Sequence, residues 1–194
     1  MWEGAALRDN VDETTAIQRL KHGDPGGLEA LVIRYQLRAI RTAYLITHGR
    51  GLAEEVVQEA FLRLCRSIRS FDPERPFEPW FLRSVINASL RAAKRSGREV
   101  PLEEVAAEQA FYCLAAQSDL PEARVEAAEM EREIQQALEH LSPRQRAVIV
   151  QRYYLDMSEA EMASESRTAE GTIKWLLHAA RRRLRGVMVE RSDE

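Results

Sequence analysis

The sequence of residues 142–185 is SPRQRAVIVQRYYLDMSEAEMASESRTAEGTIKWLLHAARRRLR, and it decides the fold class. Ser142 with Gln145 and Ser158 with Glu161 each form the capping-box pattern. In this pattern a serine, with a glutamine or glutamate three residues later, satisfies the first free backbone N–H groups of a helix. Apolar residues then recur at helical spacing. Two helices are therefore predicted to start inside this stretch.

A short turn is predicted to separate the second of these helices from a longer, basic one. The break falls near Arg167-Thr168, and the last helix runs from about Glu170 to Val189. A short helix, a tight turn and a longer helix make a helix-turn-helix, whose second helix enters the major groove in proteins that bind DNA. Helical hairpins without a DNA partner share this layout, so the pattern alone leaves both interpretations open.

The rest of the chain shows the same helical spacing, without sustained period-two alternation or hairpin dipeptides. A proline-rich segment, Asp72–Pro79, is predicted to be a loop. We therefore expect an all-α fold of two small helical domains, residues 1–98 and 121–194, joined by an acidic linker, residues 99–120. Further helices are predicted to open at Asp24-Pro25, to cover residues 52–68, to run from Trp80 to about Lys94, and to follow Leu120-Pro121.

The formal net charge of −3 hides a strong segregation along the chain. Residues 1–98 carry +4, residues 99–136 carry −8 and residues 137–194 carry +1. Two predicted helical stretches, Arg83–Arg98 and Gly171–Arg185, each hold five basic residues and no acidic one. One such stretch is usually a solvated helix face. Two of them in an acidic protein favour contact with phosphates.

Several kinds of function are not expected from this sequence. The longest apolar run, Ala110–Ala116, is far shorter than the roughly 20 residues that cross a bilayer, and the first residues lack a basic export signal. Cys65 and Cys113 have no metal or disulfide spacing, and the four histidines are scattered. No HExxH, P-loop or nucleophile motif occurs. We expect a cytoplasmic protein without a membrane span, cofactor, metal or enzymatic activity.

Motifs in both halves closely resemble the bacterial extracytoplasmic-function (ECF) sigma factors. The resemblance to their fourth conserved region rests on Leu141–Arg146, Arg152–Leu155, Ser158–Ala163 and Gly171–Lys174. The resemblance to their second region rests on Ala53–Phe61 and Phe71–Asn87. It covers roughly residues 12–98 and 121–187, in the order of the family. It implies a protein that binds core RNA polymerase, recognises promoters, separates the DNA strands and leaves during elongation.

The helix predicted over residues 52–68 carries a wide apolar stripe that must face the core of its own domain. In the ECF family the opposite side docks on the coiled coil of the polymerase β′ subunit. Its carboxylates, amide, leucine and arginines suit a specific, releasable interface. Without the resemblance, it is an ordinary solvated face. The residues assigned to polymerase binding are Glu55, Gln58, Glu59, Leu62, Arg63 and Arg66.

The loop Asp72–Pro79 and the basic helix after it resemble the part of the family that opens promoter DNA. Strand opening needs a base turned out of the duplex and held by stacking and by hydrogen bonds to its edge. The resemblance implies that this loop and Asn87 read that base in the minus-ten element. Trp80 as a core anchor and Asn87 as a local hydrogen-bonding group remain alternatives. The residues assigned to the minus-ten element are Asp72, Glu74, Arg75, Phe77, Trp80, Arg83, Asn87, Arg91, Lys94 and Arg95.

The last helix resembles the recognition helix of the family for the minus-thirty-five element, with two departures. Ser166-Arg167-Thr168 replaces an apolar-Gly-apolar turn, and Trp175, Leu176 and Ala179 occupy positions that often carry Ser, Arg and Arg. Arginine to guanine is the commonest specific contact in the major groove, so its loss is informative. The residues assigned to the minus-thirty-five element are Gly171, Thr172, Lys174, Trp175, His178, Arg181 and Arg182.

Three readings of this altered helix stay open at this point. The chain has an unusual minus-thirty-five preference, or its helix-turn-helix supplies backbone affinity more than discrimination. Alternatively, Trp175 and Leu176 form an apolar patch for an anti-sigma factor or the polymerase β flap, unless they are buried against the preceding helices. In the ECF family the linker follows the polymerase cleft, so the resemblance implies that Ala110–Ala116 packs there or holds the two domains together. A linker that merely solubilises the chain is the alternative.

The leading hypothesis for function is thus a sigma factor that directs promoter recognition and strand opening. The alternative is a sigma-like interaction module that binds polymerase or an anti-sigma factor without efficient promoter-specific initiation. The degraded turn at Ser166–Thr168 motivates that alternative.

Overall fold

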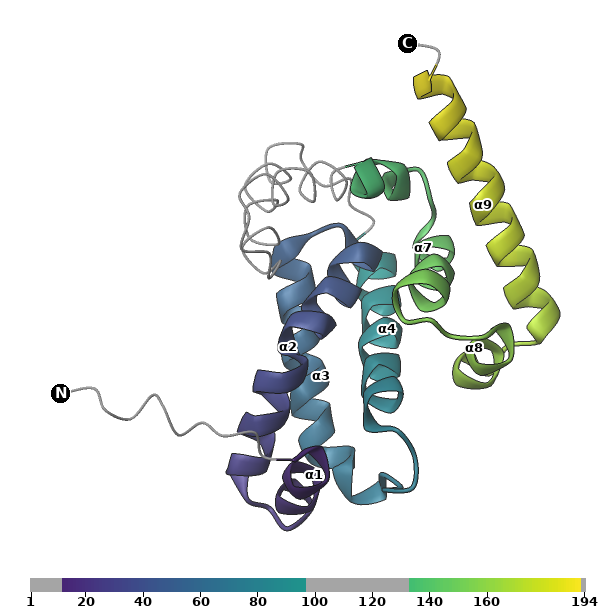
Figure 1. Cartoon of the computed structure of the whole chain (residues 1–194). Coiled ribbons are helices and arrows are strands. Elements are labelled where there is room, and N and C mark those ends of the chain that lie inside the picture. Colours follow the sequence, from purple (N-terminus) through teal and green to yellow (C-terminus); the bar gives the residue numbers. More distant parts are fainter. Residues whose placement is uncertain (1–11, 97–132, 193–194) are drawn as a thin grey trace, which may run out of the picture.

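The computed structural model describes residues 12–96 and 133–192, and every regular element in these two ranges is helical (Figure 1). The predicted all-α fold is confirmed. The predicted linker, the Ala110–Ala116 run and the helix start at Leu120-Pro121 lie outside the described residues. The elements are α1 (Glu13–Lys21), α2 (Pro25–Thr47), α3 (Arg50–Ser67), η1 (Ile68–Ser70), α4 (Phe77–Ser96), a helix over residues 133–139, α7 (Pro143–Ile149), the π-helical η2 (Val150–Tyr154), α8 (Glu159–Ser166) and α9 (Glu170–Ser192).

Three of the helix starts predicted from the sequence have the capping hydrogen bonds that were expected. The Asp24 side chain accepts a hydrogen bond of 2.8 Å from the backbone N–H of Gly26, and Pro25 takes the first position of α2. Ser142 and Ser158 both form complete capping boxes at the starts of α7 and α8. Each box satisfies two backbone N–H groups that have no partner inside the helix.

The start of α4 differs from the prediction. The helix begins at Phe77 rather than Trp80 and ends at Ser96, so the loop before it covers only residues 71–76. Pro79 therefore lies in the first turn of α4. A proline is tolerated there because the first N–H groups of a helix have no intrahelical acceptor.

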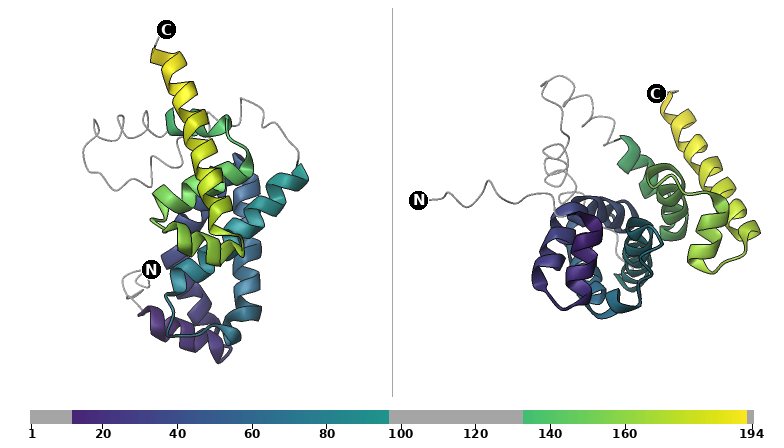
Figure 2. Two further views of the ribbon diagram at one scale, coloured as in Figure 1. Left: turned by 90° about the vertical axis from the view of Figure 1, so that its right-hand side faces the viewer. Right: turned by 60° about the horizontal axis from the view of Figure 1, so that its bottom comes forward.

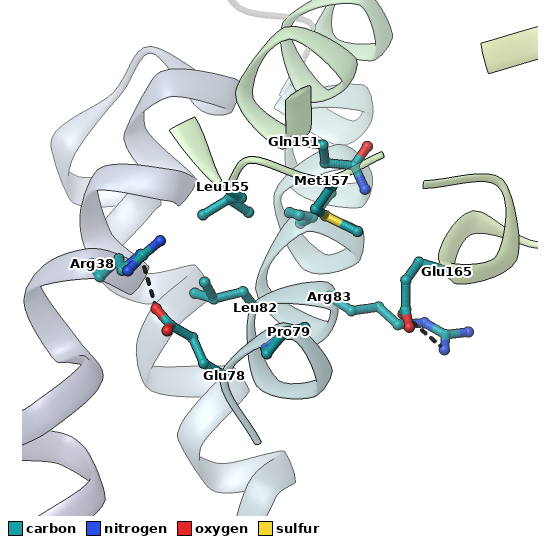
Figure 3. A pocket seen from close by; sticks show the side chains of 10 residues that line it. Arg38, Glu78, Pro79, Leu82, Arg83, Gln151, Leu155, Met157 and Glu165 are labelled. Carbon is teal, nitrogen blue, oxygen red and sulfur yellow. Dashed lines mark ion pairs between the residues drawn. The ribbon is translucent and has the colours of Figure 1, made fainter. Parts of the chain in front are cut away.

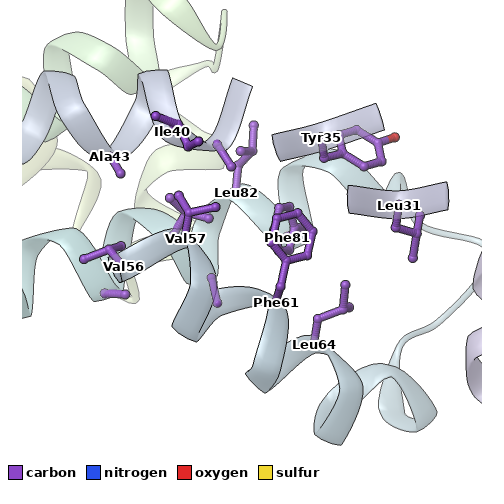
Figure 4. Packing of buried hydrophobic residues seen from close by; sticks show 14 of the residues in the cluster. Leu31, Tyr35, Ile40, Ala43, Val56, Val57, Phe61, Leu64, Phe81 and Leu82 are labelled. Carbon is purple, nitrogen blue, oxygen red and sulfur yellow. The ribbon is translucent and has the colours of Figure 1, made fainter. Parts of the chain in front are cut away.

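Helices α1 to α4 form a bundle around an aromatic core (Figure 4). Phe81 of α4 is 1% exposed, and its ring centroid lies 4.7 Å from that of Phe61 on α3 and 5.9 Å from that of Phe77. Tyr35 of α2 completes the group at 5.4 Å from Phe77. The rings join three helices, and this packing fixes which face of α4 turns outward.

A smaller core holds the C-terminal helices together. Val148 of α7, Met162 of α8 and Ile173 and Leu177 of α9 are all buried against one another. Because the four side chains come from α7, α8 and two successive turns of α9, the cluster sets the angle between α8 and α9. The helix-turn-helix thus depends on four apolar side chains in the described part of the chain.

The two helical groups pack directly against each other (Figure 2). Ile46 of α2 and Ile86 of α4 form a buried cluster with Ala147 of α7 and Val150 of η2. We call these four residues the seam. This contact between α2, α4 and α7 was not predicted from the sequence.

A polar corner flanks the seam at the C-terminal end of α2. Burial, with the charge of Arg146 as the second cause, lowers the pKa of His48 to about 3, so its imidazole is neutral at pH 7. The His48 Nε2 and Arg146 Nε atoms are buried without a hydrogen-bond partner. Each unsatisfied buried group costs about 1–3 kcal/mol. These two atoms therefore oppose the docked arrangement, which the apolar seam favours.

Candidate nucleic-acid and polymerase interfaces

A pocket of about 280 Å³ opens between α3 and α4. This volume is close to the lower limit of the range, about 300–1,000 Å³, in which proteins hold small ligands. Its floor is apolar and its rim is cationic and polar. The residues that line it are Arg63, Leu64, Ser67, Trp80, Phe81, Arg83, Ser84, Asn87 and Arg91.

The lining of this pocket suits a nucleotide. Three arginines and no carboxylate line it, and half-buried Trp80 supplies an aromatic ring, packed 4.8 Å from the ring of Phe71. The hydroxyls of Ser67 and Ser84 are committed to backbone carbonyls of their own helices. No hydrogen bond in the described residues involves the Asn87 amide. Among the residues that line the pocket, Asn87 therefore offers a neutral group whose hydrogen-bond donor and acceptor are both available to a ligand.

The structure brings together four of the residues assigned to the minus-ten element, namely Trp80, Arg83, Asn87 and Arg91. Asp72, Glu74 and Arg75 are exposed on the loop before α4, and Lys94 and Arg95 are exposed near its end. Trp80 both packs on the core and lines the pocket, so the two readings of this residue are compatible.

The assignment of Phe77 to the minus-ten element needs a correction. It was assigned to DNA, but it is 1% exposed and its ring packs against Tyr35, Phe71 and Phe81. Since α4 starts at Phe77, this ring points into the bundle. Sequence reasoning also missed Ser67 and Ser84 as pocket residues and placed Arg63 only on the polymerase face. Arg63 and Ser67 are four residues apart, and this spacing could have shown that they share one face of α3.

A second, smaller cavity of about 60 Å³ lies at the contact between the two helical groups (Figure 3). Two ion pairs border it. Arg38 Nε of α2 is 2.9 Å from Glu78 Oε1 of α4, and Arg83 Nη1 is 3.0 Å from Glu165 Oε2 of α8. Arg83 lines both this cavity and the larger pocket. The ion pair with Glu165 therefore connects a residue that is predicted to bind DNA to the C-terminal helices.

The outer side of α3 is polar, as the sequence predicted. Glu55, Gln58 and Arg66 are exposed, and Leu62 is 56% exposed. Glu59 forms an ion pair with Arg63, one turn further along the helix. The outer side of α3 thus exposes the apolar side chain of Leu62 among charged and polar groups.

The turn between α8 and α9 forms despite its unusual sequence. Arg167 adopts the left-handed conformation, with φ of 52°, at the position where the family usually has glycine. The hydroxyl of Ser166 donates to the Met162 carbonyl, and that of Thr168 to the Ser166 carbonyl. Local hydrogen bonds therefore support the turn in place of apolar contacts.

On α9 the predicted DNA-facing residues fall into two groups. Trp175 is 66% exposed, and Gly171, Thr172, His178 and Arg182 are exposed too. Lys174 Nζ is 2.8 Å from Glu170 Oε1, and Arg181 Nε donates to the Tyr153 hydroxyl at 2.8 Å. These two cations are engaged within the domain.

The structure separates the surroundings of Trp175 and Leu176, which one of the open alternatives placed in a common apolar patch and another buried against the preceding helices. Leu176 packs against the cluster of Val148, Met162, Ile173 and Leu177, while Trp175 points away from it. Neighbouring residues on a helix are separated by about 100°, so only one of the two can face outward.

Two family models match the chain, Sigma-70 region 2 over residues 31–99 and Sigma-70, region 4 over residues 131–184. The ECF RNA polymerase sigma factor SigW of Bacillus subtilis (strain 168) is 30% identical over 173 residues, covering 87% of this chain and 92% of that protein. The chain belongs to the ECF sigma factors of RNA polymerase. It is a promoter-directing sigma factor, with core RNA polymerase and promoter DNA as its partners.

Solved structures show the same fold as this sigma factor. CnrH, in complex with the cytosolic domain of CnrY, matches with a TM-score of 0.62 at 20% identity, over 92% of this chain and 99% of that one. The sigma factor RpoE from Bartonella quintana, in complex with the anti-sigma factor NepR, matches with a TM-score of 0.59 at 19% identity, over 82% and 95%. Among the described helices of this sigma factor, none is long and apolar enough to cross a membrane.

Proposed function

We propose that this sigma factor divides its work among three surfaces. The pocket between α3 and α4 holds a base turned out of the minus-ten element, the outer side of α3 docks on the β′ coiled coil, and α9 reads the minus-thirty-five element. Residues 1–98 and 121–194 form the two working domains, with residues 99–120 as the linker. Because the polymerase and the chromosome are cytoplasmic, the protein acts in the cytoplasm.

The observation that carries the minus-ten assignment is the uncommitted Asn87 amide inside an arginine-rich pocket. An amide can donate to and accept from the edge of one base at the same time. Trp80 offers a surface for stacking, worth about 1–3 kcal/mol per base. Arg91, exposed at the rim, supports the assignment by offering a charge to the adjacent phosphates.

The compact arrangement leads us to infer that the two domains separate on promoter DNA. The minus-ten and minus-thirty-five elements lie about 25 base pairs apart, which is about 85 Å of B-form DNA. Here Glu165 lies 3.0 Å from Arg83, and α9 begins five residues later at Glu170. Five residues span at most about 18 Å. The two DNA sites are therefore too close for simultaneous use.

The docked form also suits an inhibitor. RpoE from Bartonella quintana is bound by an anti-sigma factor in the solved complex. We propose that an anti-sigma factor of this chain holds the docked form, in which Arg83 is paired with Glu165. Release of the inhibitor then frees a phosphate-binding side chain.

The proposed function is tested by run-off transcription with core polymerase and the full-length chain. Start sites mapped after overexpression supply the templates. Transcripts that depend on the sequences at minus ten and minus thirty-five are the expected result. Binding to core polymerase without any promoter-dependent transcript would contradict the proposal and favour a simple interaction module.

The combined change Glu55→Lys and Glu59→Lys is expected to weaken core polymerase binding about 30- to 100-fold. Both side chains lie on the outer side of α3, and reversing two charges there removes the charge complementarity that a specific interface depends on. Affinity for core polymerase is measured by fluorescence anisotropy of the labelled sigma factor.

A matched control changes the same charge elsewhere. Glu29 of α2 and Glu133 are exposed glutamates outside α3, and their combined change to lysine should leave the affinity within about twofold, as surface substitutions usually do. Equal losses in both variants would show that net charge, rather than the α3 surface, governs polymerase binding.

The change Ile86→Asp is expected to lower the fraction of docked molecules at least tenfold. Ile86 belongs to the seam rather than to the aromatic core, and placing a carboxylate there costs several kcal/mol unless the domains part. The radius of gyration from small-angle X-ray scattering should rise while the helix content by circular dichroism stays constant.

Ile33 provides the control for this experiment. It is 61% exposed on α2, so Ile33→Asp introduces the same group without touching the seam. Its radius of gyration should match that of the unaltered protein. If Ile86→Asp behaves like this control, the seam does not hold the domains together.

A further inference from the structure

Trp175 is a large apolar side chain without a structural task in the described part of the chain. It is 66% exposed on the second turn of α9, and none of the hydrogen bonds or ring contacts of the described residues involves it. The adjacent Leu176 supplies the apolar contact to the domain core. The packing of α9 therefore does not account for a tryptophan at this position.

Trp175 lies on a helix that is rich in basic residues. Gly171, His178 and Arg182 lie on the same face, at spacings of three and four residues, and all three are exposed. Gly171–Arg185 holds five basic residues and no acidic one. These cations favour DNA as the partner of this face of α9, because they attract its phosphates, and the indole between them then faces the base edges in the groove.

No arginine lies in the first two turns of α9, and the one lysine there, Lys174, is paired with Glu170. Arg181, further along, is held by Tyr153. Ala179 is partly buried and has no group that hydrogen-bonds to a base edge. Thr172, Trp175 and His178 are the exposed side chains at the start of α9 that no ion pair or side-chain hydrogen bond of the described residues engages, and Trp175 is the large apolar one among them.

Thymine is the one standard base that presents an apolar group, its C5 methyl, in the major groove. An indole packed on that methyl removes both from water, and burying one such carbon is worth about fourfold in affinity. We propose that Trp175 selects thymine in the minus-thirty-five element through this methyl contact. The proposal rests on the assignment of α9 to that element.

The test begins with selection from two sets of promoter templates, one randomised across the minus-thirty-five element and one across the minus-ten element, using holoenzyme formed with the full chain. The unaltered protein is expected to enrich thymine at one or two positions of the minus-thirty-five element. Trp175→Ala should lose that enrichment, and Trp175→Phe should retain it. Arg183→Ala, which changes an exposed cation of the same helix, should weaken binding without changing the preference.

Deoxyuridine provides the decisive comparison, because it lacks only the methyl group. Replacing the enriched thymine by deoxyuridine should lower promoter binding about fourfold for the unaltered protein and leave Trp175→Ala unchanged. Equal enrichment by both proteins, or no effect of deoxyuridine, would overturn the proposal. Loss of core polymerase binding in Trp175→Ala with the base preference intact would instead make Trp175 a protein contact and also overturn it.

The proposed function fails separately from this inference. If holoenzyme enriches no sequence at either element, promoter recognition itself is contradicted and the role of Trp175 falls with it. If a minus-ten preference appears and thymine is not selected upstream, only the inference about Trp175 is wrong.

Discussion

Replacing Asn87 by alanine is expected to slow open-complex formation about ten- to hundredfold while core polymerase binding stays unchanged. The amide lies in the pocket between α3 and α4, where it is not used by the fold. A side-chain amide that pairs with a base edge contributes about 1–3 kcal/mol of discrimination. Permanganate footprinting of unpaired thymines measures the rate of strand separation directly.

A template that is already unpaired at the minus-ten element separates strand opening from other defects. If Asn87 holds the base that leaves the duplex, such a template should recover most of the lost transcription, because the cost of unpairing is removed. Ser84→Ala is the matched control, since its hydroxyl bonds to the Phe81 carbonyl and lies in the same pocket. Normal opening by Asn87→Ala would remove the amide from the mechanism.

Replacing Phe81 by alanine is expected to lower the free energy of unfolding by about 3–5 kcal/mol. The ring is 1% exposed and contacts Tyr35, Phe61 and Phe77, so its removal leaves a cavity where three helices meet. A domain of this size has only about 5–15 kcal/mol of stability in total. The midpoint of thermal unfolding, followed by circular dichroism, should fall by more than about 10 °C.

The exposed residue Ile33 again supplies the comparison, because Ile33→Ala removes apolar atoms that are already in water. Its midpoint should stay within about 2 °C of the unaltered protein. A loss in Phe81→Ala no larger than in this control would mean that the aromatic cluster does not stabilise the bundle.

The helices were predictable because their start signals are local. Asp24, Ser142 and Ser158 cap the helices that they were predicted to cap. The prediction for α4 was wrong by three residues because Pro79 was read as part of the loop, although a proline also fits the first turn of a helix. Phe77 was misassigned for the same reason, since moving the start of α4 turned its ring into the core.

The surfaces were less predictable because they depend on how helices pack. Arg63 and Asn87 are 24 positions apart in the sequence and line one pocket only because α3 lies against α4. Trp175 and Leu176 look alike in the sequence. Leu176 packs on the core and Trp175 is exposed, because the cluster around Leu177 fixes the rotation of α9.

By itself, the sequence determined the class of fold, the positions of most helices and the membership of a family, because caps, apolar periodicity and motif order are written in short stretches of chain. The tertiary structure alone decided which side chains share a pocket, which face of α9 meets solvent and that the two domains dock through Ile46, Ile86, Ala147 and Val150. Each of these depends on contacts between residues far apart in the chain. Local patterns carry no information on such contacts until the packing is known.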